Sequence, residues 1–135
     1  MRQIKFRAWD VFSEKMDYEV FLDPNGKVAA FSPLWGFYVR GNSDDEMKLM
    51  QFTGLRDRNG QEIYEGDVLV DEYGFIHVVQ YFQPDCRYIT VVIEAFKSGN
   101  WDDSNEHEDL VWVECKVIGN IYEHPYLLKG DSKDA

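Results

Sequence analysis

A series of short strand patterns, each closed by residues that favour turns, is the feature that most constrains the fold. Between Gly54 and Tyr122 the chain has five short segments rich in β-branched and aromatic residues. These segments are Val68–Tyr73, Phe75–Phe82, Tyr88–Phe96, Leu110–Val113 and Lys116–Tyr122. Turn formers such as Gly74, Gln83-Pro84-Asp85 and Ser98-Gly99-Asn100 separate them. Short strands at close spacing with little helix predict a small antiparallel barrel or sandwich.

The N-terminal part also shows strand patterns. Ile4–Trp9 alternates apolar with polar residues, which is the period of a half-buried strand. Asp23-Pro24-Asn25-Gly26 is a strong turn signal, and Lys27–Phe31 is expected to be a strand. Met47–Phe52 has two readings. It continues a helix that starts at Ser43 with Glu46 in a capping box, or it is a strand.

The charged stretch Asp57-Arg58-Asn59-Gly60 predicts a hairpin, because Asn-Gly is the strongest short hairpin signal. We expect Asn59 and Gly60 both to take the positive φ of a type I′ turn. An EF-hand calcium loop needs Gly at its sixth position, whereas Gly60 is fourth from Asp57. The hairpin therefore explains these charges better than a metal loop does.

Other candidate metal and nucleophile residues are scattered. Trp101–Asp109 holds five acids and His107, but their spacing matches no defined site, so a solvated loop is expected and cation binding at 102–109 stays open. The possible zinc ligands are Cys86, Cys115, His77, His107 and His124, with no pair at ligand spacing. Cys86 has no base beside it in sequence. The sequence thus predicts no catalytic, cofactor-binding or metal residue, no cofactor and no enzymatic activity.

Charge and aromatic content bear on the partners. The net charge is −11, from 25 acidic and 14 basic residues, and such a surface repels phosphate backbones. Aromatic residues make up 16% of the chain, with Trp35, Phe37 and Tyr38 close together. Small β barrels stack nucleic-acid bases on such rings, or use them as core and protein interface. The negative net charge favours a role of these aromatic residues in the core and in a protein interface over binding of nucleic acid.

Nothing in the sequence predicts export or membrane insertion. The N-terminus has no apolar segment of a signal peptide, and no apolar run approaches the ~20 residues of a membrane helix. Two widely spaced cysteines suit free thiols in a reducing compartment. We expect a soluble, intracellular protein.

Three blocks carry a family resemblance: Met1–Asp10, Leu49–Asp67 (LMQFTGLRDRNGQEIYEGD) and Val117–Leu128. Their content and order resemble the YopX-like proteins of bacteriophages and prophages. The resemblance implies a phage or prophage origin, the cytoplasm of a bacterial host, and a mostly β fold with an SH3-like barrel. It implies no reaction and supplies no catalytic residue, because the function of that family is unknown.

We therefore predict a mainly β protein with minor α structure. An SH3-like small antiparallel barrel covers residues 54–125, an N-terminal β-rich extension (1–53) packs on it, and residues 126–135 form a C-terminal tail. The expected function is a non-enzymatic phage accessory protein that acts through protein–protein contact, by self-association or with a phage or host protein. The alternative is a small β barrel that binds nucleic acid.

Overall fold

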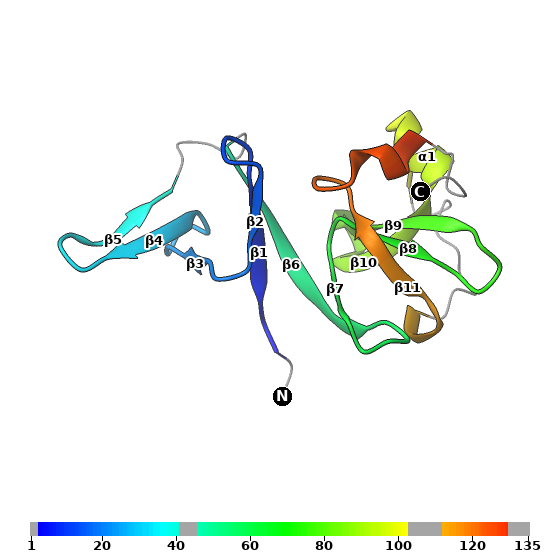
Figure 1. Ribbon diagram of the computed structural model, residues 1–135, viewed down its shortest axis with the longest axis horizontal. Helices are drawn as coiled ribbons and strands as arrows, with labels where there is room; N and C mark the ends of the chain where they lie inside the picture. Colours follow the sequence, from blue (N-terminus) through cyan, green and yellow to red (C-terminus); the bar gives the residue numbers. More distant parts are fainter. Residues whose placement is uncertain (1–2, 41–45, 103–111, 130–135) are drawn as a thin grey trace. The chain divides into compact units, whose positions relative to one another are not determined.

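The computed structural model describes residues 3–40, 46–102 and 112–129, and Figure 1 shows their strands and helices. The chain divides into two compact units after Gln51. We call residues 3–51 the N-terminal unit and the described residues from Phe52 onward the C-terminal unit. Antiparallel strands build both, so the protein is mainly β.

The N-terminal unit consists of two small sheets. In the first, β1 (Phe6–Asp10) lies between β2 (Lys15–Asp17) and the first half of β6 (Met47–Arg56). The second has the order β3-β4-β5, with β3 at Phe21–Leu22, β4 at Val28–Ser32 and β5 at Gly36–Val39. Residues 47–52 are therefore a strand, and residues 43–45 of the alternative helix start lie outside the described residues.

A compact apolar cluster holds this unit together. Ala8, Val28 and Met47 are buried, and they come from three different strands. Partly buried side chains of Val20, Leu22 and Leu49 pack against them. Because Val28 and Leu22 are paired across β3 and β4, one face of the second sheet is covered by this core.

The C-terminal unit is built on a four-stranded antiparallel sheet of order β10-β9-β8-β11. Its strands are β8 (Asp67–Val70), β9 (Ile76–Phe82), β10 (Arg87–Val92) and β11 (Lys116–Asn120). The short β7 (Glu62–Tyr64) pairs with the second half of β6. The curled strands form a half-barrel, so the prediction of a mainly β fold with a small antiparallel barrel is confirmed (Figure 1).

The two central strands of this sheet are buried on both faces. One apolar cluster contains Val68 and Val78, and the other contains Leu69 and Val79. Since successive side chains of a strand point to opposite faces, these neighbours belong to two separate cores. That is why β8 and β9 show apolar runs instead of strict alternation.

One turn design closes three hairpins of the chain. Asp23, Asp57 and Asp71 each stand three residues before a glycine with positive φ: Gly26 (80°), Gly60 (82°) and Gly74 (89°). In every case one aspartate oxygen accepts two backbone N–H groups, two and four residues further on, at 2.8–2.9 Å. The expected type I′ turn at 57–60 is wrong, because Asn59 does not have positive φ. The side-chain bonds of Asp57 stabilise a turn in which only the glycine needs that conformation.

Asp57 also joins distant parts of the chain. It is 5% exposed, and its second oxygen accepts the backbone N–H of Val117 at 2.9 Å. The neighbouring Arg58 donates its backbone N–H to the carbonyl of Cys115 at 2.9 Å. These two bonds fix the hairpin to the start of β11, so the carboxylate serves as a structural acceptor.

The expected strand Tyr88–Phe96 is wrong in its second half. β10 ends at Val92, and the helix α1 covers Ile93–Ser98. Ile93 and Phe96 are one helical turn apart and pack in the same core cluster, while Gly99, at φ 72°, ends the helix. The β-branched run before Ile93 concealed the helix signals that follow it.

Two expectations near the C-terminus also need correction. The expected strand 110–113 is instead a short 3-10 helix at Trp112–Glu114, as far as it is described. The segment assigned to a tail, 126–135, begins inside another 3-10 helix, Pro125–Lys129, and a further 3-10 helix covers Gln83–Asp85 between β9 and β10. Leu127 is 2% exposed and packs with Val68 and Val78, so Leu127 and the adjacent Leu128 complete this core cluster.

We predict that Asp57→Ala lowers the free energy of unfolding by about 3 kcal/mol, because it leaves three partly buried backbone N–H groups without this acceptor. Urea denaturation followed by circular dichroism measures this loss. Asp23→Ala is the matched control, since the same turn there lacks the third bond, and we expect a loss of about 1 kcal/mol. Equal losses in the two variants would contradict the role given to the bond to Val117.

Candidate functional site

The second sheet of the N-terminal unit carries aromatic side chains on its solvent face. The register pairs Phe31 with Phe37 and Phe21 with Ala29, which places these side chains on one face. The Phe31 and Phe37 ring centroids are 5.1 Å apart, and those of Phe21 and Phe37 are 5.4 Å apart. We call Phe21, Phe31 and Phe37 the aromatic face.

The aromatic face is exposed even though its rings contact one another. Phe21, Phe31 and Phe37 are 50%, 55% and 65% exposed. An antiparallel sheet with one face on a core normally has polar residues on the other face. Here both faces are apolar, which is the pattern expected of a surface that a partner covers.

The connection between β4 and β5 extends the apolar surface. Leu34 and Trp35 are both about four-fifths exposed, and their backbone N–H groups donate to the Ser32 hydroxyl. Together with the aromatic face, these side chains expose roughly 600 Å² of apolar surface, taking about 150–250 Å² for each complete aromatic side chain. A stable interface needs about 800 Å² from each partner, so the patch is large enough to form most of one.

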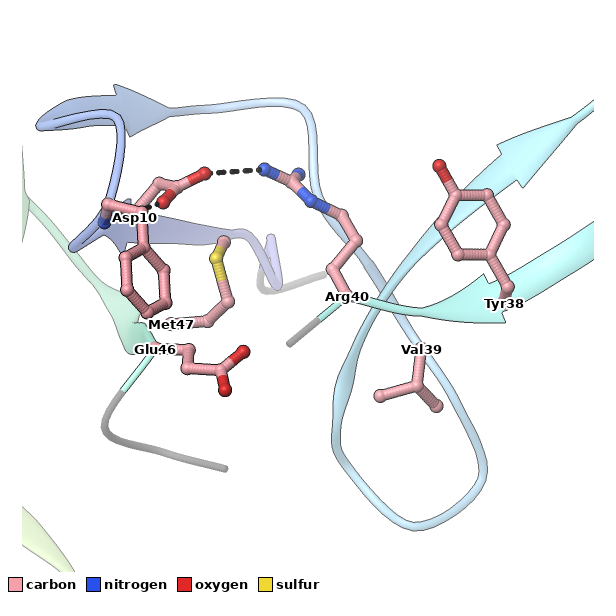
Figure 2. A pocket seen from close by; sticks show the side chains of 7 residues that line it. Asp10, Tyr38, Val39, Arg40, Glu46 and Met47 are labelled. Carbon is pink, nitrogen blue, oxygen red and sulfur yellow. Dashed lines mark hydrogen bonds and ion pairs between the residues drawn. The ribbon is translucent and has the colours of Figure 1, made fainter. Parts of the chain in front are cut away.

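A pocket of about 320 Å³ lies in the same unit and shares β5 with the aromatic face. Its lining comes from the end of β1, the end of β5 and the start of β6: Asp10, Phe12, Tyr38, Val39, Arg40, Glu46 and Met47. Figure 2 shows the Arg40 side chain crossing between Val39 and Tyr38 on one side and Asp10 and Met47 on the other.

Two carboxylates hold the Arg40 guanidinium. It donates to Asp17 at 2.5 Å and lies 3.7 Å from Asp10. Burial opposes ionisation of Asp17, but the hydrogen bonds from Arg40 and from the Glu19 backbone outweigh it and lower the pKa of that carboxyl. The pKa of Asp10 is also lowered, chiefly by the backbone N–H of Ser13 and less by that of Phe12, with the charge of Arg40 adding to the effect. Both acids are therefore ionised at neutral pH.

The residues considered as possible zinc ligands or nucleophiles are dispersed. Within residues 3–40, 46–102 and 112–129, no three His, Cys, Asp or Glu side chains come together as a metal site. Cys86 is exposed in a tight turn, Cys115 is buried in an apolar cluster, and His124 accepts the backbone N–H of Asn120. His107 and residues 103–109 of the acidic segment lie outside the described residues.

His77 has a structural partner. Its Nε2 lies 3.0 Å from Asp71 Oδ2, and both side chains are buried. Burial opposes the charge on Asp71, yet hydrogen bonds from His77 and from the backbone of Phe75 and Tyr73 lower its pKa. Burial, and secondarily the charge of Asp71, raises the pKa of the Cys115 thiol to about 11. A buried thiol that resists ionisation is a poor nucleophile, so this group of residues does not form a nucleophilic centre.

Sequence reasoning did not single out Phe21, Phe31 or Arg40. The alternation of Phe31 with its neighbours along the strand could have indicated an exposed face. Phe21 gives no such pattern, because it belongs to a strand of only two residues. Asp10, Arg40 and Glu46 come from three separate segments, so no spacing in the sequence could have indicated the pocket.

Charge is distributed unevenly between the two units. Residues 3–51 contain six Lys and Arg and eight Asp and Glu, which gives −2 of the net charge of −11. The rest of the chain contains eight Lys and Arg and seventeen Asp and Glu, which gives the remaining −9. The aromatic face therefore belongs to the unit that is nearly neutral, where approach of another acidic molecule is least opposed.

The fold and the site define a small, mainly β protein with two units and an exposed aromatic sheet face. Residues 5–129 match the model of the YopX protein family, and the chain belongs to this family. The solved structure of protein EF1440 from Enterococcus faecalis is similar, with a TM-score of 0.58 and 27% sequence identity. The match covers 95% of this chain and 99% of that one.

Two further comparisons bear on the earlier expectations. Comparison with curated proteins finds no match to this chain. No helix among the described residues is long and apolar enough to cross a membrane. The family resemblance noted in the sequence is confirmed by the match to the YopX model.

We predict that Asp17→Asn lowers the free energy of unfolding by about 1 kcal/mol at pH 7, because it removes a charged hydrogen bond to Arg40. A lowered folded-state pKa means that this contribution is present above about pH 4 and is lost as the pH falls further. Urea denaturation at pH 7, 5, 4 and 3 should therefore show the difference from wild type shrinking below pH 4. Glu19→Gln, which removes an exposed charge nearby, is the control, and a difference that stayed constant with pH would contradict the prediction.

We also predict different reactivity of the two cysteines. At pH 8 a disulfide reagent such as Ellman's should modify one thiol per native chain within minutes, because Cys86 is exposed and Cys115 is buried with a raised pKa. In denaturant it should modify both. Cys86→Ser should leave the native protein unreactive, and rapid modification of that variant would show that the Cys115 core opens readily.

Proposed function

We propose that the protein is a non-enzymatic interaction module that self-associates through the aromatic face. The observation that carries the proposal is that Phe21, Phe31 and Phe37 contact one another on a sheet face and are each at least half exposed among the described residues. Aromatic residues that become buried in an interface are among those that contribute most to its binding free energy.

The second copy of the chain is the occupant that the charges and the strand arrangement favour. β5 is an edge strand of its sheet, and its sequence Gly-Phe-Tyr-Val has no charge and no proline to prevent pairing with another strand. A face without charge can contact an identical copy without placing like charges opposite each other. The remainder of the proposal is a phage or prophage accessory role in the cytoplasm of a bacterial host, supported by membership in the YopX family.

The test compares oligomeric state in matched variants. Light scattering after gel filtration, at 10–200 µM protein, should show a dimer or larger species for wild type. Phe31→Ser combined with Phe37→Ser should shift it to monomer, because about half of the aromatic area is lost. Phe75→Ser is the matched control, since Phe75 is as exposed as Phe37 but belongs to the C-terminal unit.

Two outcomes would count against this proposal. A strict monomer at the highest concentration, with no host protein retained in a pull-down, would remove its basis. Retention of single-stranded nucleic acid in a filter-binding assay at low salt, lost in the Phe31/Phe37 variant, would favour the alternative that the rings stack bases.

A further inference from the structure

The pocket beside Arg40 is a second site in the same unit, distinct from the aromatic face. Its volume of about 320 Å³ is at the lower end of the range for small-ligand sites. The site therefore suits one small group and not a large cofactor. Its lining combines charged, aromatic and aliphatic side chains, so the chemistry of the ligand can be argued from the walls.

The charge of the walls favours a cation. Arg40 supplies the positive charge among the lining residues, and its guanidinium is already held by Asp17 and Asp10. Glu46 adds a further carboxylate to the lining, and in Figure 2 it points into the space below Arg40, toward Val39. Asp17 and Asp10 neutralise the charge of the Arg40 guanidinium. The carboxylates would therefore repel an anion in the pocket and attract a cation.

The remaining walls favour an organic cation over a metal ion. Phe12 provides an aromatic ring, and Met47 and Val39 provide apolar contact, while the Tyr38 ring leaves β5 on the side opposite to Val39 (Figure 2). Aromatic faces attract ammonium and guanidinium groups, and an aliphatic stem gains from burial against apolar side chains. A hard metal ion would need several carboxylates converging on one point, and the part of the chain that the structure describes has no group of three such ligands.

We propose that this pocket binds an ammonium or guanidinium group carried on an aliphatic stem. Asp10 and Glu46 pair with the charge, the ring of Phe12 lies beside it, and the stem lies against Met47 and Val39. Arg40 is a positioning residue, because its bonds to Asp17 and Asp10 hold the acids of two strands in place. The proposal does not depend on the aromatic face being an interface.

The test is a titration of the full chain labelled with nitrogen-15, followed by amide shifts in two-dimensional NMR spectra. The probes are Nα-acetyl-lysine methylamide, spermidine and, as a neutral analogue, the lysine probe acetylated also at Nε. We expect saturable shifts at Asp10, Arg40 and Met47 with the two cations, with a dissociation constant on the order of 1 mM, and none with the neutral analogue. If spermidine binds at least tenfold more tightly than the lysine probe, the natural ligand is a free polyamine. Otherwise the natural ligand is a basic side chain of a protein.

Variants separate a specific site from general attraction. Asp10→Asn, which keeps the oxygen that accepts the Phe12 and Ser13 backbone, and Glu46→Gln should each weaken binding about fivefold or more. Glu19→Gln, outside the pocket, should change it less than twofold. Absence of saturable shifts at 20 mM probe, or equal weakening by Glu19→Gln, would overturn the proposal. The Phe31/Phe37 variant should bind the probes normally, so failure of the pocket and failure of the aromatic face are distinguishable.

Discussion

One buried carboxylate, that of Asp57, joins a hairpin of the C-terminal unit to the last strand of its sheet. Asp57 accepts three backbone N–H groups, two within its own turn and one from Val117, sixty residues later in the chain. A carboxylate in this position closes a hairpin and determines where the last strand of the sheet begins. Without this carboxylate, three partly buried backbone N–H groups would lose their acceptor.

Hydrogen-bond partners also distinguish the acids that only build the fold from those that interact with Arg40 beside the pocket. Asp23, Asp57 and Asp71 are committed to backbone N–H groups, so their abundance in the sequence says little about chemistry. Asp10 and Asp17 also accept backbone N–H groups, but both interact with the Arg40 guanidinium as well, and Asp10 lines the pocket beside it. Exposed aromatic rings and this pocket both belong to the nearly neutral unit, while most of the net negative charge belongs to the other.

Local signals in the sequence predicted the β class, the turns and the family, and tertiary effects explain what they missed. The hairpin at 57–60 was predicted, but its conformation was not, because the side chain of Asp57 replaces the need for positive φ at Asn59. The helix that begins at Ile93 directly follows a β-branched run, so local preference favours a strand there. The packing of Ile93 and Phe96 in the core favours the helix instead. The aromatic face depends on register between strands, and the pocket depends on residues from three segments, neither of which a linear pattern records.

The repeated turn has a consequence for how the surface can change over time. Each of the three turns requires an aspartate and a glycine, while the two positions between them hold Pro24-Asn25, Arg58-Asn59 and Glu72-Tyr73. The connection is thus made by backbone geometry and one carboxylate, and the intervening pair contributes little to it. Mutational drift can change the charge and bulk of these loop tips without disturbing the strands that they join.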